Sequence, residues 1–220
     1  LVDLDPRLHT TRTNLERVLR QRNTLLRQTG GQLTPGAGDS LDVWDSKLAE
    51  TGEVLVTARQ RLVDRLSPLV DDHLRVLSGG VSNAALAYEK SWTGSNLATA
   101  LGEARRDDLR RGTTTVGPHR DEVSITLDNL GARHHSSQGE QRSLALAMRL
   151  AGHCLVSEHT GMKPVVLLDD VFSELDSDRS TALVALLPQA QVVLTSAGSL
   201  PPGVVADRWY QIAAGRVEVQ

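Results

Sequence analysis

Large aliphatic side chains recur every seven residues in the first third of the chain, and this spacing constrains the fold more than any other feature. The column consists of Leu41, Leu48, Leu55, Leu62, Leu69 and Val76. A sustained seven-residue repeat requires a long helix that packs against another helix. Arg65 and Asp72 interrupt the neighbouring column, so the predicted seam is imperfect. We therefore predict a helix over residues 41–76, with a kink at Pro68 because the proline ring clashes with the preceding turn.

A second helical pattern precedes this one and carries an excess of positive charge. Its apolar positions are Leu8, Leu15, Val18, Leu19, Leu25 and Leu26. Residues 6–28 hold six arginines (Arg7, Arg12, Arg17, Arg20, Arg22 and Arg27) against a single Glu16. The glycines and proline of residues 29–40 interrupt the helix, and Asp39 or Ser40 can cap the next one. These features predict an antiparallel helical hairpin, either a plain bundle element or a projecting arm with a basic face.

Composition excludes some classes of protein. The formal net charge of −3 gives the molecule as a whole no strong attraction for nucleic acid, in contrast to the local basic stripe. Cys154 is the single cysteine, which predicts a reducing cytoplasm. The longest apolar runs fall far short of the ~20 residues that span a bilayer. A chain that begins at Leu1 without methionine is expected to be a piece of a longer protein.

The middle of the chain mixes strand and helix patterns. Residues 84–92 alternate like a strand, and residues 95–112 read as a helix capped by Ser95 and closed by Gly112. Val123, Ile125 and Leu127 alternate with polar residues, which predicts a half-buried strand before a turn at 128–131.

The last ninety residues predict alternating helices and strands. We expect a helix over 140–156, a strand "PVVLL" buried on both faces, a helix from about 176, a second buried strand "AQVVLTS" and a closing hairpin that turns at 214–215. A strand–helix–strand unit is by default right-handed and parallel. The predicted fold class is therefore α/β, with a partial parallel sheet, flanking helices and an α-helical hairpin arm.

Two short stretches carry candidate chemistry. Asp169 and Asp170 end the first buried strand, where ligands of parallel sheets gather and where carboxylates can hold Mg²⁺ or orient a water. "SSQGEQRS" (136–143) opens a helix, where exposed N–H groups can bind an anion. Both stretches have a plainer interpretation, in which the acids begin a turn and the serine is an ordinary N-cap with Glu140 in the first turn.

The order of the motifs is more specific than any one of them. "GPHRD" (117–121), "SQGEQR" (137–142) and "LLDDVFSELD" (167–176), together with the leading helix, resemble the RecF family of recombination and repair proteins, whose heads are ABC-type ATPases of the SMC-like kind. The resemblance implies a helical arm over residues 1–112. It implies the C-terminal half of an ATPase head over residues 113–220.

The resemblance also implies roles for individual residues. Ser137 and Gly139 match the signature loop that contacts the γ-phosphate of ATP on the partner subunit, and Asp176 matches the acid that faces that subunit. Asp169 matches the acid that serves Mg²⁺ through water. Asp170 stands where most ABC proteins have a catalytic glutamate, which implies slow, switch-like hydrolysis.

The resemblance implies further positions. Thr195 and Ser196 lie where many ABC proteins place a switch histidine. Candidate phosphate-facing or DNA-facing residues are Arg12, Arg20, Arg27, His119, Arg120 and Arg142.

One departure concerns the nucleotide itself. The sequence has no G-x-x-x-x-G-K-[ST] phosphate loop, which in the RecF family lies in a segment before the arm. We therefore expect a C-terminal fragment that binds ATP weakly or not at all alone, within an intact protein that uses ATP and Mg²⁺. The implied partners are gapped or junction DNA, a second copy of the protein, and the RecR and RecA proteins. Two alternatives remain open: a non-enzymatic protein-interaction module, and the head of another SMC-like repair ATPase.

Overall fold

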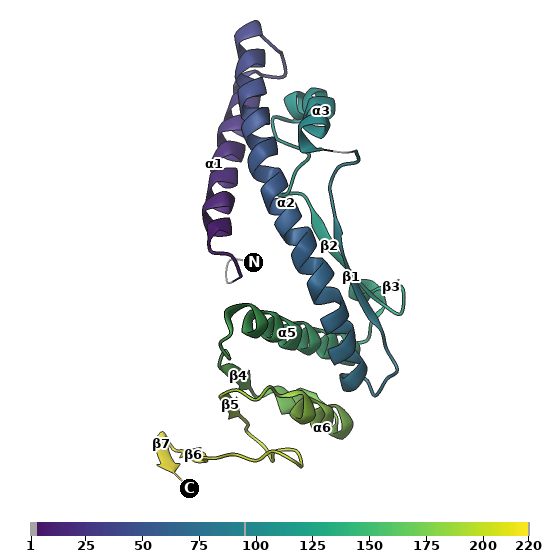
Figure 1. Ribbon diagram of the computed structural model, residues 1–220, viewed down its shortest axis with the longest axis vertical. Coiled ribbons are helices and arrows are strands. Elements are labelled where there is room, and N and C mark those ends of the chain that lie inside the picture. The colour runs from purple at the N-terminus through teal and green to yellow at the C-terminus, as the bar shows by residue number, and fades with distance from the viewer. Residues whose placement is uncertain (1–3, 95, 220) are drawn as a thin grey trace.

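A long helix forms the spine of the molecule. The computed structural model describes residues 4–94 and 96–219. Helix α2 (Pro35–Leu77) runs through most of its length, and α1 (Arg7–Gln28) lies beside the upper part of α2 (Figure 1). Leu15 and Val18 of α1 share one buried cluster with Leu48 and Leu55 of α2. The predicted helical hairpin is therefore present, and its seam uses the seven-residue column.

The hairpin turn is shorter than the sequence suggested. Helix α2 begins at Pro35, so Asp39 and Ser40 lie inside the helix and do not cap it. Proline suits the first turn of a helix, where its missing N–H would have no partner. The Ser40 hydroxyl instead donates to the Gly36 carbonyl oxygen, 2.9 Å away. Helix α2 also continues through Pro68, so this proline does not end the helix.

An antiparallel sheet packs against the lower half of α2. Strands β1 (Ala84–Glu89), β2 (Glu122–Leu127) and β3 (Leu130–Gly131) lie in that order, with Leu86 opposite Ile125. Helix α2 protects the free edge of β1: Ser67 and Asp71 accept hydrogen bonds from the backbone N–H groups of Leu86 and Ala84. The predicted alternation of β2 holds only in part, because Leu127 is buried whereas Val123 is 42% exposed.

Helix α3 (Leu97–Arg111) follows β1 and packs on the arm. Its N-cap is Asn96, whose side chain accepts from the Thr99 N–H, and Gly112 closes it in the left-handed conformation as predicted. The predicted cap Ser95 lies outside the described residues. A short helix α4 (Ala132–His135) then leads into α5 (Gln138–Thr160).

The lower part of the molecule is a strand–helix–strand unit covered by α5. Strands β4 (Val166–Asp169) and β5 (Val192–Thr195) pair in parallel, and the short 3₁₀ helix η1 (Val171–Glu174) and α6 (Ser177–Leu186) connect them. The expectation that both strands are buried on both faces is wrong. Leu168 is buried, but Leu167 is 73% exposed and Val193 is 46% exposed, because no other part of the described chain covers that face.

The chain ends in the predicted hairpin, formed by β6 (Tyr210–Ala213) and β7 (Arg216–Val219). Ala214 and Gly215 make its turn with φ of 49° and 76°. The fold is thus α/β with a partial parallel sheet and a helical arm, as predicted. The division of the chain at residue 112 stays a prediction, and both the β1–β2 pairing and the larger buried cluster continue across it. Among the described residues no helix is both long and apolar enough to cross a membrane.

Candidate functional site

The two adjacent aspartates lie where β4 ends, and β5 holds both of them. The Thr195 hydroxyl donates to Asp169 Oδ1 at 2.5 Å. The Asp170 N–H donates to the carbonyl and the hydroxyl oxygens of Thr195, at 3.1 and 3.2 Å. Both carboxylates are exposed. Thr195 therefore orients Asp169 while leaving its second oxygen open to solvent.

Asp170 has an uncommon backbone conformation. Its φ of 49° and ψ of 29° are left-handed, a conformation that costs an L-residue other than glycine on the order of 1 kcal/mol. The turn is held by Ser173, whose N–H and hydroxyl both donate to the Asp170 carbonyl oxygen, at 3.3 and 2.8 Å. The Asp170 side chain accepts a hydrogen bond from the Ala197 N–H at 3.4 Å. The surrounding bonds thus hold the second acid at the start of η1.

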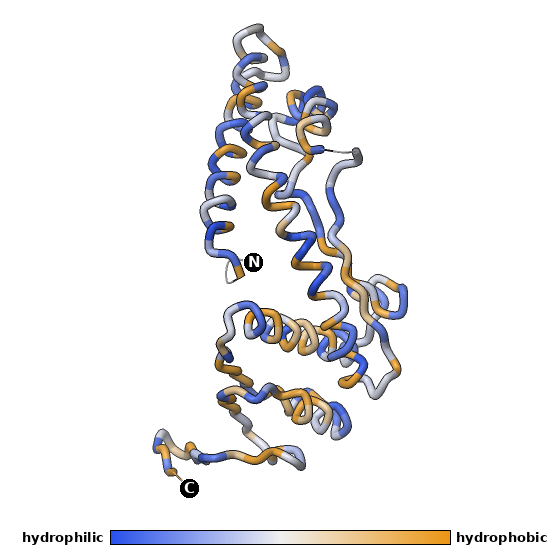
Figure 2. Tube along the Cα trace, in the orientation of Figure 1, coloured by the Kyte–Doolittle hydropathy of each residue, from blue (hydrophilic) through white to orange (hydrophobic). Residues whose placement is uncertain are grey.

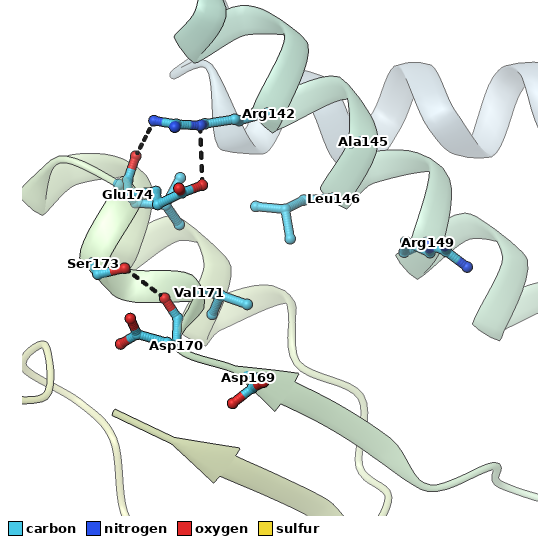
Figure 3. Close-up of a pocket in the computed structure, with 10 residues that line it drawn as sticks. Arg142, Ala145, Leu146, Arg149, Asp169, Asp170, Val171, Ser173 and Glu174 are labelled. Atoms are coloured by element: carbon cyan, nitrogen blue, oxygen red, sulfur yellow. Dashed lines mark hydrogen bonds and ion pairs between the residues drawn. The ribbon is translucent and has the colours of Figure 1, made fainter. Parts of the chain in front are cut away.

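An open pocket of about 450 Å³ lies between α5 and the segment that follows β4. Asp169 and Asp170 line one side of it, and Arg142 and Glu174 lie across from them (Figure 3). Arg142 Nε is 3.0 Å from Glu174 Oε2, and its Nη1 donates to the Glu174 carbonyl oxygen at 3.5 Å. Arg142 is therefore at the pocket, as a phosphate-facing residue requires, but an acid already engages it.

The Ser137 turn is an N-terminal capping box. The Ser137 N–H donates to Glu140 Oε2 at 2.7 Å, and Ser137 Oγ accepts from the Glu140 N–H at 3.3 Å. The Ser137 hydroxyl also donates to the same carboxylate at 2.8 Å. These bonds, the backbone one first, lower the pKa of Glu140 below its usual value. The plainer interpretation of this turn is thus realised, and the Glu140 carboxylate is the anion now at the start of α5.

Gly139 and Asp176 are brought together by an arginine that sequence reasoning missed. Asp176 caps α6 by accepting from the Arg179 N–H at 2.8 Å, and its other oxygen is 3.6 Å from Arg179 Nε. The Arg179 guanidinium lies directly against Gly139, so that a side chain on Gly139 would overlap its Nη1. The i, i+3 spacing of Asp176 and Arg179 at a helix start was a signal for the pairing of these two side chains, but not for the packing of Arg179 on Gly139.

The remaining predicted residues lie elsewhere. The Ser196 hydroxyl donates a hydrogen bond to the Gly198 carbonyl oxygen and accepts one from the Gly198 N–H, both at 3.2 Å. His119 is exposed as a whole residue; its Nε2 donates to the Thr114 carbonyl oxygen at 3.1 Å, and partial desolvation of the ring lowers its pKa. Arg120 follows it on the surface. Arg12, Arg20 and Arg27 are exposed on α1, which lies apart from the β4–β5 region in Figure 1.

The predicted basic stripe loses one member to the interior. Arg22 is fully buried, with Nε 2.5 Å from Asp45 Oδ1 and Nη1 2.7 Å from Asp108 Oδ2. Nη1 also donates to the Thr114 hydroxyl at 2.8 Å. The signal was present, because Arg22 lies seven residues after Leu15 on the apolar face of α1.

Within the described residues no group of three His, Cys, Asp or Glu side chains could hold a metal by itself. A lone oriented carboxylate such as Asp169 suits Mg²⁺ that keeps its waters and shares phosphate oxygens. Both Asp169 and Ser137 are exposed. The ion pair between Arg142 and Glu174 links α5, the helix that Ser137 opens, to the segment that follows Asp169. The fold is of the ABC-ATPase-like α/β class, with a partial parallel sheet, flanking helices and a helical hairpin arm.

Comparisons with known proteins give the particular family. The chain is 41% identical to the DNA replication and repair protein RecF of Streptomyces avermitilis and 39% identical to that of Frankia alni. These alignments include 97% and 99% of the chain, and 61% and 62% of the relatives. A solved structure of the recombination mediator protein RecF with ATP, in the RecFOR pathway, matches 99% of the chain and 59% of its own with 27% identity and a TM-score of 0.80. No family model matches the chain. The chain belongs to the RecF family, and it spans about three-fifths of the length of the relatives it matches.

Proposed function

We propose that the chain is the C-terminal part of an ATP-controlled DNA clamp of recombinational repair. The observation that carries the proposal is the exposure of the Asp169–Asp170 pair at a pocket that α5, the helix opened by Ser137, also lines through Arg142, in a chain of the RecF family. The matched structure is of RecF with ATP, and a second one is of RecF with an ATP analogue. ATP with Mg²⁺ would supply a removable phosphate contact between two copies of the protein.

Each residue of the site has a separate task in this proposal. Asp169, oriented by Thr195, holds Mg²⁺ through water, and Asp170 orients an attacking water with a side chain short enough to make hydrolysis slow. Ser137 and Gly139 face the phosphate on the partner subunit, and Asp176 faces that subunit. Dimerisation then depends on contacts that differ between the ATP and ADP states.

The arm contributes the proposed DNA contacts. Arg22 is buried, and Arg7 and Arg12 are paired with Asp5 and Glu16 at 2.9 and 3.5 Å, so three of the six α1 arginines remain for phosphates. Three neutralised phosphates correspond to a slope of about −2.7 for the logarithm of affinity against the logarithm of salt concentration. Gapped DNA, RecR and RecA are the partners that the RecF resemblance implies.

The test uses the full-length protein that contains this chain. Sedimentation velocity measures dimerisation with and without ATP, and fluorescence anisotropy measures affinity for gapped DNA. Asp169→Asn is expected to abolish the ATP-dependent dimer and to weaken ATP-stimulated DNA binding by about tenfold, within the usual range of coupling between sites. Asp178→Asn, an exposed aspartate in the first turn of α6, is the matched control and should leave both unchanged.

A protein-interaction module is the second candidate, and specific bonds favour it. Ser137 and Asp176 both cap helices, which explains them without a nucleotide. DNA affinity and oligomeric state that ignore both ATP and the Asp169→Asn change would reject the clamp and leave this candidate.

A further inference from the structure

One ion pair and one packing contact join the start of α5 to the segment that follows the aspartates. Arg142, in the second turn of α5, contacts both the carboxylate and the backbone carbonyl of Glu174 (Figure 3). Arg179 of α6 lies across Gly139 and against Asp176. One arginine thus reaches from α5 to the segment and the other reaches from the segment's helix back to α5.

The segment between the two sites is short and anchored at several points. Asp170 is held to Thr195, and its carbonyl oxygen is held by Ser173. Phe172 is buried in the main core, and Leu175 packs against it. The turn from Asp170 to Glu174 is therefore firmly held, and we expect a movement of Asp170 to move Glu174 as well.

We propose that Arg142 and Glu174 are positioning residues that transmit the state of the Asp169–Asp170 site to the Ser137 turn of the same chain. This inference rests on the proposed function, in which the two ends of the link serve two different ATP molecules. Arg142 contacts the backbone carbonyl of Glu174 as well as its carboxylate, so the pair fixes the position of the Glu174 backbone relative to α5 in addition to neutralising charge. The packing of Arg179 against Gly139 holds the other end of the segment, at the start of α6, in a fixed position relative to α5.

The link makes the two nucleotides of a dimer cooperative. A change in the phosphate contacts at Asp169 in one chain moves Glu174, and with it the first turns of α5 that face the other ATP. In the present structure the Glu140 carboxylate holds the Ser137 N–H and hydroxyl. A phosphate that arrives at this turn must therefore displace an internal anion, and a small shift of α5 changes how readily it does so.

The experiment measures cooperativity in the full-length protein. ATP-dependent dimerisation is followed by sedimentation velocity over a range of ATP concentrations, and ATP affinity of the monomer is measured at protein concentrations too low for dimers. Arg142→Ala and Glu174→Ala should each lower the Hill coefficient towards one and weaken dimerisation by about two- to fivefold, as expected for an exposed pair. The double variant should be no worse than either single one, and the monomer's ATP affinity is compared for each variant so that any direct loss of ATP binding is separated from loss of cooperativity.

The matched control is a second exposed ion pair that involves α5. Arg65 of α2 and Glu158 of α5 are 3.5 Å apart, with side chains 50% and 61% exposed, against 44% and 57% for Arg142 and Glu174. Arg65→Ala should leave the Hill coefficient unchanged. The exchanged variant Arg142→Glu with Glu174→Arg should recover part of the cooperativity, which a purely structural loss would not allow.

Two results separate the inference from the function beneath it. If Asp169→Asn abolishes ATP-dependent dimerisation but the Arg142 and Glu174 variants keep wild-type cooperativity, or add independently, the link is wrong and the clamp stands. If ATP fails to promote dimerisation of the wild-type protein at all, both proposals fall.

Discussion

At the scale of single residues, the buried Arg22 holds the arm together. Its guanidinium bridges Asp45 of α2 and Asp108 of α3, and Arg105 Nη2 reaches the same Asp45 at 2.5 Å. Asp108 also accepts from the N–H and the hydroxyl of Thr115, at 2.8 and 2.6 Å. The charges of three helices are therefore neutralised inside the protein, where an unpaired charge is costly.

Removal of this arginine should be severe. Arg22→Met leaves the buried Asp108 without a charged partner and Asp45 with Arg105 alone, and is expected to lower the free energy of unfolding by ~3–5 kcal/mol. Urea denaturation measures the change. Arg22→Met combined with Asp108→Asn should recover part of the loss, because the stranded charge is removed.

The control lies two positions earlier. Arg20 is exposed on the same helix, and Arg20→Met should change stability by no more than ~0.5 kcal/mol. Similar losses for Arg20→Met and Arg22→Met would contradict the role given to the buried network.

At the scale of elements, most of what the structure contains could be predicted from periodicity. Local spacing, which a sequence displays directly, determines several of these features. They are the seven-residue column, the end of α3 at Gly112, the start of α6 at Asp176 and the turn at 214–215. The tertiary contacts of charged side chains could not be predicted in the same way. The place of Arg22 on the apolar face of α1 signals its burial but not its partners on α2 and α3, and nothing local to Arg142 indicates its pairing with Glu174 at the rim of a pocket.

The candidate site shows the same division. The positions of Asp169, Asp170 and Ser137 could be predicted, because Asp169 ends β4, Asp170 follows it and Ser137 directly precedes α5, whereas their roles stay predictions. Glu174 and Arg179 could not be assigned, because their significance comes from packing between α5 and the segment after β4.

Helix α3 offers a matched pair of glycines that tests its predicted end. Gly112 has φ of 63° and lies against Arg27, whereas Gly102 is inside the helix with open space around the position of a Cβ. Gly112→Ala should lower stability by ~1–2 kcal/mol, because alanine is strained in the left-handed conformation. Gly102→Ala should raise it by ~0.5–1 kcal/mol, because alanine favours the helix.

Thermal or urea unfolding of the two variants measures both signs. Opposite signs are the expected outcome, whereas stabilisation by Gly112→Ala would show that α3 does not end in this conformation in solution.

At the scale of the whole molecule, apolar side chains are unevenly covered. Figure 2 shows apolar residues along the β4, β5 and β6–β7 region as well as between the packed helices. Leu167, Ile212 and Val219 are 73%, 74% and 70% exposed, although each lies in a strand. An apolar strand face of this kind is usually covered by another layer.

The relatives are longer than this chain, so the same side chain can have different surroundings in the two lengths of protein. We expect Leu167→Ala to be nearly neutral in the 220-residue chain, because the side chain already lies in water there. In a protein of full RecF length, the same substitution should cost ~2–5 kcal/mol, the usual loss for a large-to-small change in a core.

Leu183 is the internal control for this comparison. It is fully buried within the described residues, so Leu183→Ala should be costly in both lengths of protein. Urea denaturation of the four variants gives the result as a difference between lengths, which cancels effects of the substitution on the unfolded chain. An equal cost of Leu167→Ala in both lengths would show that this strand face remains exposed in the longer protein and that the two-stranded sheet is not extended or covered there.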